Sequence, residues 1–397
     1  MNIFLYLYII IFCLSLVEFV FPKYHTLNRQ VFHVAFGLSF VVFAIKYYFG
    51  PDILTYVPLY ENIGTPAQVL RGETFPSDEI EMGYALFCSI LKYLGASFWM
   101  MTLSVTTFYF FTLYFVLNHI NRYKTFALLI LFILDSNLVI YEFRQCISVS
   151  LYLWMVMFLF DKKYVASLMM FFLASFMHKS GLFIGLGTFL IYGLRHIKIS
   201  KQAYIMLFIL LLTFLIIPLK DFLLNVLEIL PLKDSVNNSI EHHLEVAKPF
   251  QWIFIIYAIT ILCAGYYRNT SKEDAKWHWI IFACLLIVVI LFQYWFILNR
   301  LRSYFLPLAI VYIIHTIVTS KNKSVLPKQL LVLSILLFSA NFCRGYYNGL
   351  QQSVSKVNAT CTIFDLRKKS KEQIKKEQMQ KAAKFWKEEY LKYELEK

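Results

Sequence analysis

Long apolar runs, separated by short clusters of charged residues, divide almost the whole of the 397-residue sequence. The runs are about 16–20 residues long, which is the length that an α-helix needs to cross the hydrocarbon core of a bilayer. Soluble chains are about half apolar and a quarter charged, whereas this chain has 59% hydrophobic and 16% charged residues. The sequence therefore predicts an all-α, polytopic membrane protein and excludes a string of soluble domains.

We expect about twelve transmembrane helices from the number and length of these runs. No basic region precedes the first run and no small-residue cleavage site follows it, so we interpret it as an anchor and not as a removed signal peptide. The predicted helices begin near Asn2, Val31, Phe98, Thr125, Gln145, Tyr164, Gly181, Ala203, Phe250, Trp277, Arg302 and Lys328.

Basic residues concentrate in the odd-numbered connections between these helices, as in residues 195–201. The positive-inside rule then makes these connections cytoplasmic and puts the N-terminus outside. The net charge of +14 comes from short loops and from the C-terminal tail, so it predicts no basic face and no nucleic-acid partner. The seven cysteines have no CxxC spacing and predict no metal site.

Two of the predicted outer loops are long, residues 50–97 and residues 218–249. The first is rich in acidic residues and contains a short apolar segment, Tyr84–Leu94, that predicts a surface or re-entrant helix. The second contains the pair His242–His243, which has no spaced third ligand and so predicts no metal site.

We interpret residues 1–345 as a single integral membrane domain and residues 346–397 as a charged, partly helical C-terminal tail. An even number of spans puts this tail outside, whereas its lysine-rich composition favours the cytoplasm. Ala382, Trp386, Tyr390 and Tyr393 recur at helical spacing. The tail could therefore lie on a membrane surface or form a solvated charged helix, and we expect it outside.

Charged side chains at the edges of spans are costly and are therefore candidates for function. Arg144 begins the fifth predicted span and His178 ends the sixth. The chain runs about 18 residues, or roughly 27 Å of helix, from Arg144 to the turn at 161–163. It then returns about 16 residues, or roughly 24 Å, to His178. The spacing predicts that both side chains reach the same outer face of the membrane.

Arg300 and Arg302, with Tyr304, are expected at another outer turn. An arginine presents a rigid fork of donors that matches phosphate oxygens and stays charged at accessible pH, and a histidine can exchange a proton near neutrality. A substrate with a lipid tail and a diphosphate would use both. Each of these residues alone also fits a simpler role, because arginines at span ends often only snorkel to the interface and a histidine near a helix end is often structural.

The order of these motifs resembles that of the Wzy-type polysaccharide polymerases, and in particular of their EpsG-like branch. The resemblance covers about residues 45–310 and depends on the order and spacing of several short motifs. They are Asp52 with Tyr56 and Tyr60, Glu81-Met82-Gly83-Tyr84, Arg144-Gln145, residues 174–180 (Ala-Ser-Phe-Met-His-Lys-Ser) and Arg300-x-Arg302-x-Tyr304. The long charged tail after Leu366 is not part of this pattern.

The resemblance implies an enzyme of the bacterial inner membrane with its active site facing the periplasm. It would join oligosaccharide repeat units carried on undecaprenyl diphosphate into O-antigen, capsular polysaccharide or exopolysaccharide, without a metal or other cofactor. The substrate, membrane lipid, and a chain-length regulator and flippase of the same pathway would be its partners.

Under this resemblance, Arg144 and one or both of Arg300 and Arg302 hold the diphosphate and stabilise its charge as it leaves. His178 is the first candidate for the base or hydrogen-bond partner of the acceptor hydroxyl, and Glu81 is its rival. The predicted catalytic residues are Arg144, His178, Arg300 and Glu81, and the predicted substrate-binding residues are Arg302, Tyr304, Gln145, Lys179, Asp52, Tyr56, Tyr60 and Tyr84.

Two other classes of protein fit part of the pattern. A flippase or transporter of lipid-linked oligosaccharides would also need cationic residues facing a lumen, but transporters usually contain internal repeats and paired broken helices, which this sequence lacks. A related membrane glycosyltransferase or an O-antigen ligase would use similar residues, and the sequence does not separate these enzymes from a polymerase.

Overall fold

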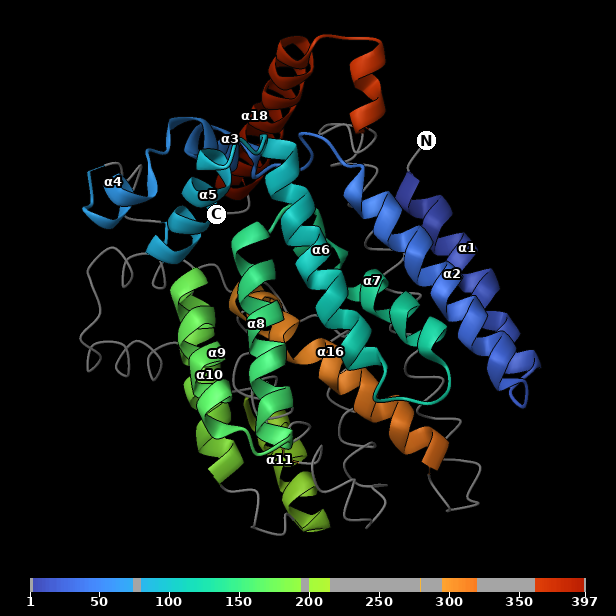
Figure 1. The fold of residues 1–397 in the computed structure, drawn as a ribbon. Coiled ribbons are helices and arrows are strands. Elements are labelled where there is room, and N and C mark those ends of the chain that lie inside the picture. The colour runs from blue at the N-terminus through green and yellow to red at the C-terminus, as the bar shows by residue number, and fades with distance from the viewer. Residues whose placement is uncertain are drawn as a thin grey trace. The chain divides into compact units, whose positions relative to one another are not determined.

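The computed structural model describes residues 3–73, 80–193, 200–214, 279, 295–319 and 361–395, and these residues form α-helices, one 3₁₀ helix and an isolated β-bridge. The chain forms two compact units, residues 1–182 with 342–397, and residues 183–341. The helices are α1 (Ile3–Val20), α2 (His25–Ala44), α3 (Ile53–Asn62), α4 (Pro66–Leu70), α5 (Met82–Tyr93), α6 (Phe98–Leu117), α7 (Lys124–Ile140), α8 (Phe143–Phe160), α9 (Tyr164–Met177), α10 (Lys179–Gly193), α11 (Lys201–Phe214), α16 (Trp295–Thr319), η2 (Ile363–Arg367) and α18 (Lys371–Leu395) (Figure 1).

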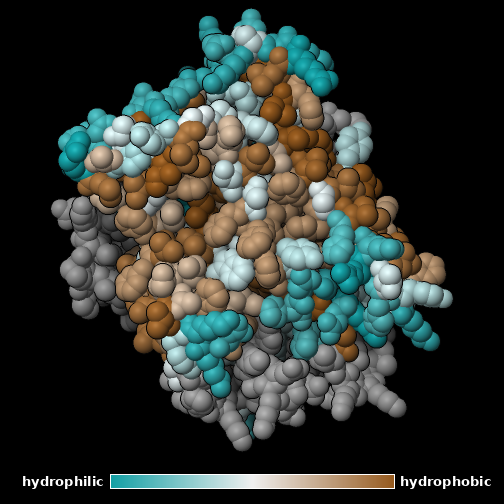
Figure 2. Space-filling view, in the orientation of Figure 1, coloured by the Kyte–Doolittle hydropathy of each residue, from teal (hydrophilic) through white to brown (hydrophobic). Residues whose placement is uncertain are grey.

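Within the described residues, α2, α6 and α8 are long and apolar enough to cross a membrane, and Tyr6–Val20 and Tyr164–Met177 are shorter apolar helices. Figure 2 shows hydrophobic side chains over the helices of the first unit and hydrophilic ones over α18 and α4. Several spans in one chain are the expected pattern of a multi-pass membrane protein.

Most of the described helices begin where the apolar runs predicted them. Helices α6 and α9 begin at the predicted residues, and α1, α7, α8, α10 and α11 begin within two residues of them. The predicted starts near Phe250, Trp277 and Lys328, and the loop with His242–His243, lie outside the described residues.

Two predicted helix starts are wrong. Helix α2 begins at His25 instead of Val31, because its first polar turns contain no residue that prevents a helix. Helix α16 begins at Trp295 and not at Arg302. Arg300, Arg302 and Tyr304 therefore lie inside a helix and not at a turn between two spans, since no Gly or Pro between Trp295 and Tyr304 ends the helix there.

The core of the first unit is built around the antiparallel pair α8 and α9, which lie side by side in Figure 1. A tight turn joins them, in which Lys162 adopts a left-handed conformation with φ of 60°. The Ser148 hydroxyl of α8 donates to the carbonyl of Ala174 at 2.8 Å, and the Ser167 hydroxyl of α9 donates to the carbonyl of Met155 at 3.0 Å. These bonds fix the register of the pair at both of its ends.

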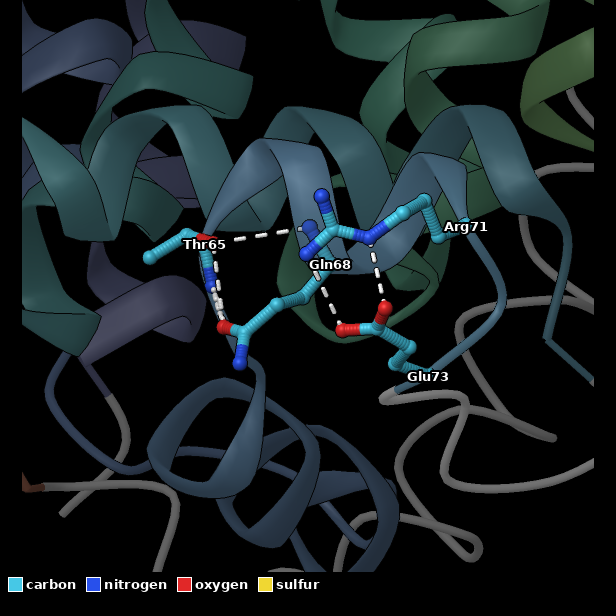
Figure 3. A network of polar contacts seen from close by, with 4 residues as sticks. All are labelled: Thr65, Gln68, Arg71 and Glu73. Atoms are coloured by element: carbon cyan, nitrogen blue, oxygen red, sulfur yellow. Dashed lines mark hydrogen bonds and ion pairs between the residues drawn. The ribbon is translucent and has the colours of Figure 1, made fainter.

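Short helices cover one end of this unit, and among them α5 confirms the predicted short helix near Tyr84–Leu94. The Lys92 ammonium of α5 donates to the carbonyls of Glu61 and Ile63 at 2.7 and 2.8 Å. Helix α4 begins with a capping box between Thr65 and Gln68, and an exposed ion pair between Arg71 and Glu73 follows it (Figure 3). The two Lys92 bonds hold the end of α3 and the residue after it against α5.

The C-terminal tail packs on the same end of the first unit, where Figure 1 shows α18 beside α3. The backbone N–H of Tyr47 donates to the carbonyl of Cys361 at 3.1 Å. The Trp386 indole donates to the carbonyl of Pro51 at 3.3 Å, and the side chains of Lys375 and Glu61 form an ion pair. Helix α18 therefore lies on the same face of this unit as the loop that begins at residue 50.

Candidate functional site

An ion pair between Arg144 and Glu81 forms the centre of the candidate site. Arg144 is the second residue of α8, and Glu81 is the residue that precedes α5. The guanidinium Nη1 lies 2.8 Å from a carboxylate oxygen of Glu81, and Nε donates to the Tyr56 hydroxyl at 3.4 Å. Since the side chains are only 21% and 8% exposed, the pair is partly shielded from solvent and holds the guanidinium in a fixed plane.

The second carboxylate oxygen of Glu81 accepts a hydrogen bond from the backbone N–H of Lys179 at 3.1 Å, at the start of α10. Burial tends to raise the pKa of Glu81, but the positive charge that His178 carries when protonated, the charge of Arg144 and the Lys179 N–H outweigh burial and hold the pKa below its usual value. Glu81 is therefore ionised at neutral pH and joins α5, α8 and the junction between α9 and α10.

Gly83 allows α5 to approach α9 closely enough for these contacts. A Cβ at this position would clash with the carbonyl oxygen and the ring of Phe176, near the end of α9. Only glycine leaves this space empty, because every other residue carries a Cβ. The close approach puts Glu81, two residues earlier, beside the end of α9 and thus beside His178.

His178 is the single residue between α9 and α10, and its backbone is extended, with φ of −157° and ψ of 131°. Its Nδ1 accepts from the backbone N–H of Ser180 at 3.2 Å and lies 2.7 Å from the Ser180 hydroxyl. An accepting Nδ1 leaves the proton of a neutral imidazole on Nε2. With this assignment, Nε2 is the donor atom of the His178 ring.

Three of the predicted substrate-binding residues, Tyr56, Tyr60 and Tyr84, are buried, with 4%, 4% and 0% of their surface exposed. The Tyr56 ring packs against Tyr84 and Phe143 at centroid distances of 5.6 and 5.1 Å. Burial raises the pKa of Tyr56 to about 12, so its hydroxyl stays protonated. These buried rings present no open face to a sugar. Tyr56 contacts Arg144 directly, Tyr84 packs on Tyr56, and the Tyr60 hydroxyl donates to the carbonyl of Ala96.

The remaining predicted residues are distributed over both units. Asp52 directly precedes α3, Gln145 is buried, and Lys179 contributes its backbone N–H while its side chain is exposed. Arg300 is exposed on α16 and Tyr304 is fully buried there. Within the first unit, the structure brings Arg144, Glu81, Tyr56 and His178 together, whereas the Arg300–Tyr304 motif lies on α16 of the second unit.

Three residues of this region have roles that the sequence does not predict. Gly83 and Ser180 stand in the motifs of the family resemblance, but only the packing gives them the roles described above. Lys46 is a charged residue directly after an apolar run, which was the available signal, and it is fully enclosed between α6 and α7.

The model of the EpsG family matches residues 29–352 of the chain, a stretch that contains Asp52, Glu81, Arg144, His178 and the Arg300–Tyr304 motif. The chain belongs to the EpsG family. This confirms the resemblance that the sequence motifs indicated and links the chain to exopolysaccharide biosynthesis. The helices η2 and α18 lie beyond the region that the EpsG model matches. No curated protein and no solved structure shows significant similarity to the chain.

Proposed function

We propose that the chain is a polysaccharide polymerase that joins repeat units carried on undecaprenyl diphosphate at the outer face of the bacterial inner membrane. The growing glycan leaves its lipid diphosphate and moves to a hydroxyl group of the incoming unit. The observation that carries the proposal is the ion pair between Arg144 and Glu81, held beside His178 at one end of the α8–α9 pair.

A guanidinium held in a fixed plane suits a diphosphate, because phosphate oxygens match the same fork of donors as a carboxylate. Glu81 and Tyr56 set this plane before any substrate binds. We infer that the diphosphate takes over donors that Glu81 binds in this structure, and that Arg144 then stabilises the negative charge that grows on the leaving diphosphate.

His178 and Glu81 have different roles toward the acceptor hydroxyl of the incoming unit. An Nε2–H of His178 can donate to a phosphate oxygen or to the acceptor hydroxyl oxygen. When the diphosphate binds Arg144, it shares the guanidinium charge that lowers the pKa of Glu81. The pKa of Glu81 then rises, and the carboxylate becomes a stronger base. Glu81 thus becomes the acceptor of the hydroxyl proton, and His178 orients the acceptor.

The proposal is tested by the lipid-linked glycans of a strain in which the gene is deleted. A polymerase deletion leaves single repeat units exposed at the outer face and no ladder of longer chains. A flippase deletion leaves no glycan at that face, and a ligase deletion leaves long chains on the lipid carrier; either of these results would overturn the proposal.

Complementation of this strain with variants links the function to the site. Arg144→Ala is expected to abolish the ladder while the protein stays in the membrane at its normal level. Arg71→Ala is the matched control, because Arg71 also forms an ion pair with a glutamate, Glu73, but at an exposed position away from the site. It should restore a normal ladder.

A further inference from the structure

Helix α7, which leads directly into the site, is held at both ends by buried ionisable side chains from neighbouring segments. At its N-terminal end, Glu18 of α1 accepts from the backbone N–H groups of Thr125 and Phe126 at 3.0 and 3.2 Å. It also accepts from the Thr125 hydroxyl at 2.8 Å. The first N–H groups of a helix have no partner within the helix and carry its positive end, so the carboxylate both caps and neutralises this end.

Lys46 caps the C-terminal end of α7. Its ammonium donates to the carbonyl of Val139, one residue before the end of the helix, and to the Thr106 hydroxyl of α6 at 3.1 Å. Lys46 is only 4% exposed. The last carbonyls of a helix lack partners within the helix and carry its negative end. The Lys46 amine caps this end although burial lowers its pKa to about 7.

The same ammonium also touches the beginning of α8. It lies 5.3 Å from the ring centroid of Phe143, the first residue of α8 and the neighbour of Arg144. The Phe143 ring in turn packs on Tyr56, the residue that accepts from the Arg144 Nε. Lys46 therefore contacts both sides of the short connection, Tyr141–Glu142, that sets the start of α8 relative to the end of α7.

The backbone around Lys46 contacts both the segment at Thr362 and the connection between α7 and α8. Lys46 forms a β-bridge with Thr362, and the N–H of Ile363 donates to the carbonyl of Ile45 at 2.9 Å. Gly50, with φ of 90°, brings this segment so close to Tyr141 that a Cβ would lie 2.6 Å from the Cβ of Tyr141. The segment that carries Lys46 is thus packed directly against the connection between α7 and α8.

We infer that Lys46 is a positioning residue for Arg144: by capping α7 and contacting Phe143, it fixes where α8 begins and hence where the guanidinium meets Glu81. The effect of Lys46 on substrate binding rests on the proposed function, whereas its effect on the connection between α7 and α8 does not. Glu18 provides a matched comparison, because it caps the same helix at the end away from Arg144.

Amide hydrogen exchange of the full chain in lipid nanodiscs tests the positioning role without any substrate. The reporting amides are Tyr141, bonded to the Asn137 carbonyl at 3.1 Å, and Cys146, bonded to that of Glu142 at 2.8 Å. Lys46→Met should speed their exchange about tenfold, the factor that follows from losing a charged hydrogen bond. Glu18→Gln should speed exchange near Thr125 and leave these two amides unchanged.

Thr106→Val provides a second, milder variant, because it keeps the lysine and removes one of its two acceptors. It should speed exchange of the same amides about threefold, so the test does not depend on the folding of Lys46→Met. Unchanged exchange at Tyr141 and Cys146 in the folded variants would overturn the inference.

Binding of undecaprenyl diphosphate to the same nanodiscs tests the link to Arg144. Lys46→Met should weaken binding about 10–100-fold, the range expected when a binding group is misplaced, and Glu18→Gln should not. In the Arg144→Ala background, Lys46→Met should weaken binding no further. Additive losses of binding in the double variant would contradict the link to Arg144. If the wild-type chain itself does not bind the diphosphate, the proposed function is contradicted. The hydrogen-exchange result then decides the positioning role of Lys46.

Discussion

The guanidinium of Arg144 and the carboxylate of Glu81 form an ion pair at 2.8 Å, although 63 residues separate them in the sequence. An arginine that only anchors a span extends its head group into water. Arg144 instead has a side chain only 21% exposed and is held by Glu81 and Tyr56. This arrangement favours a role for Arg144 in holding an anion over a role as an interfacial anchor.

Glu81→Gln should reduce the stability of the fold by about 1–3 kcal/mol, because it removes the charge that pairs with Arg144. The pKa of Glu81 is lower in the fold than its usual value of 4.5, so folding stabilises the ionised form. This contribution is complete above the unfolded pKa and is lost as the pH falls through the lower folded pKa. Thermal unfolding in detergent should therefore separate the wild type from Glu81→Gln at neutral pH and less so in acid. A difference that persists undiminished in acid would contradict the ion-pair account.

Gly83→Ala should disrupt the site although it adds only a methyl group. The new Cβ meets the backbone carbonyl of Phe176, which cannot move aside as a flexible side chain could. We expect a cost of about 1–3 kcal/mol and loss of the glycan ladder. Gly37→Ala in α2 is the control, since no atom lies within 4 Å of its added Cβ, and it should be neutral or stabilising by up to about 1 kcal/mol. Equal behaviour of the two variants would contradict the role given to Gly83.

The sequence predicted the positions of most described helices because the bilayer fixes the length and composition of a span. It also correctly indicated the short helix near Tyr84 and the family. The prediction of a turn at Arg300 and Arg302 is wrong, because no Gly or Pro there ends α16. Hydropathy favours water for such residues, but an arginine within a helix can still extend its head group towards an interface.

The contacts of the site could not be predicted from the sequence, because they depend on packing between distant segments. No local pattern indicates that Gly83 approaches Phe176, and hence that Glu81 reaches Arg144. The burial of Tyr56 and Tyr84 was missed for a similar reason. Their motif has polar neighbours, whereas the space they occupy is enclosed by α3, α5 and Phe143.

His178→Gln should keep part of the polymer yield, whereas His178→Ala should lose most of it. A glutamine can still donate a hydrogen bond as the Nε2–H of His178 would, but alanine cannot. Loss of one such donor typically costs about 10²–10³-fold in rate. Polymer yield at matched protein levels measures this difference. Equal, complete losses in both variants would instead assign His178 the proton transfer that we give to Glu81.

The tail and the loop that begins at residue 50 should be reached from the same side of the membrane, because α18 contacts α3. In a chain whose seven native cysteines are replaced, Lys387→Cys and Glu73→Cys should both react with an impermeant thiol reagent on intact spheroplasts. Lys163→Cys, at the other end of α8, should react only after the membrane is opened. Labelling of Lys387→Cys together with Lys163→Cys would contradict this arrangement.

The proposed function depends above all on binding of the diphosphate of a lipid-linked glycan by the guanidinium of Arg144. Its most direct test is the purified chain in vesicles, supplied with one repeat unit on undecaprenyl diphosphate, with product length as the readout. The wild type and Arg71→Lys should make chains of many units. Arg144→Lys keeps the charge but loses the planar fork, and it should make at least about tenfold less polymer, since a single charged hydrogen bond contributes that much. Wild-type chains made by Arg144→Lys would contradict this role of Arg144.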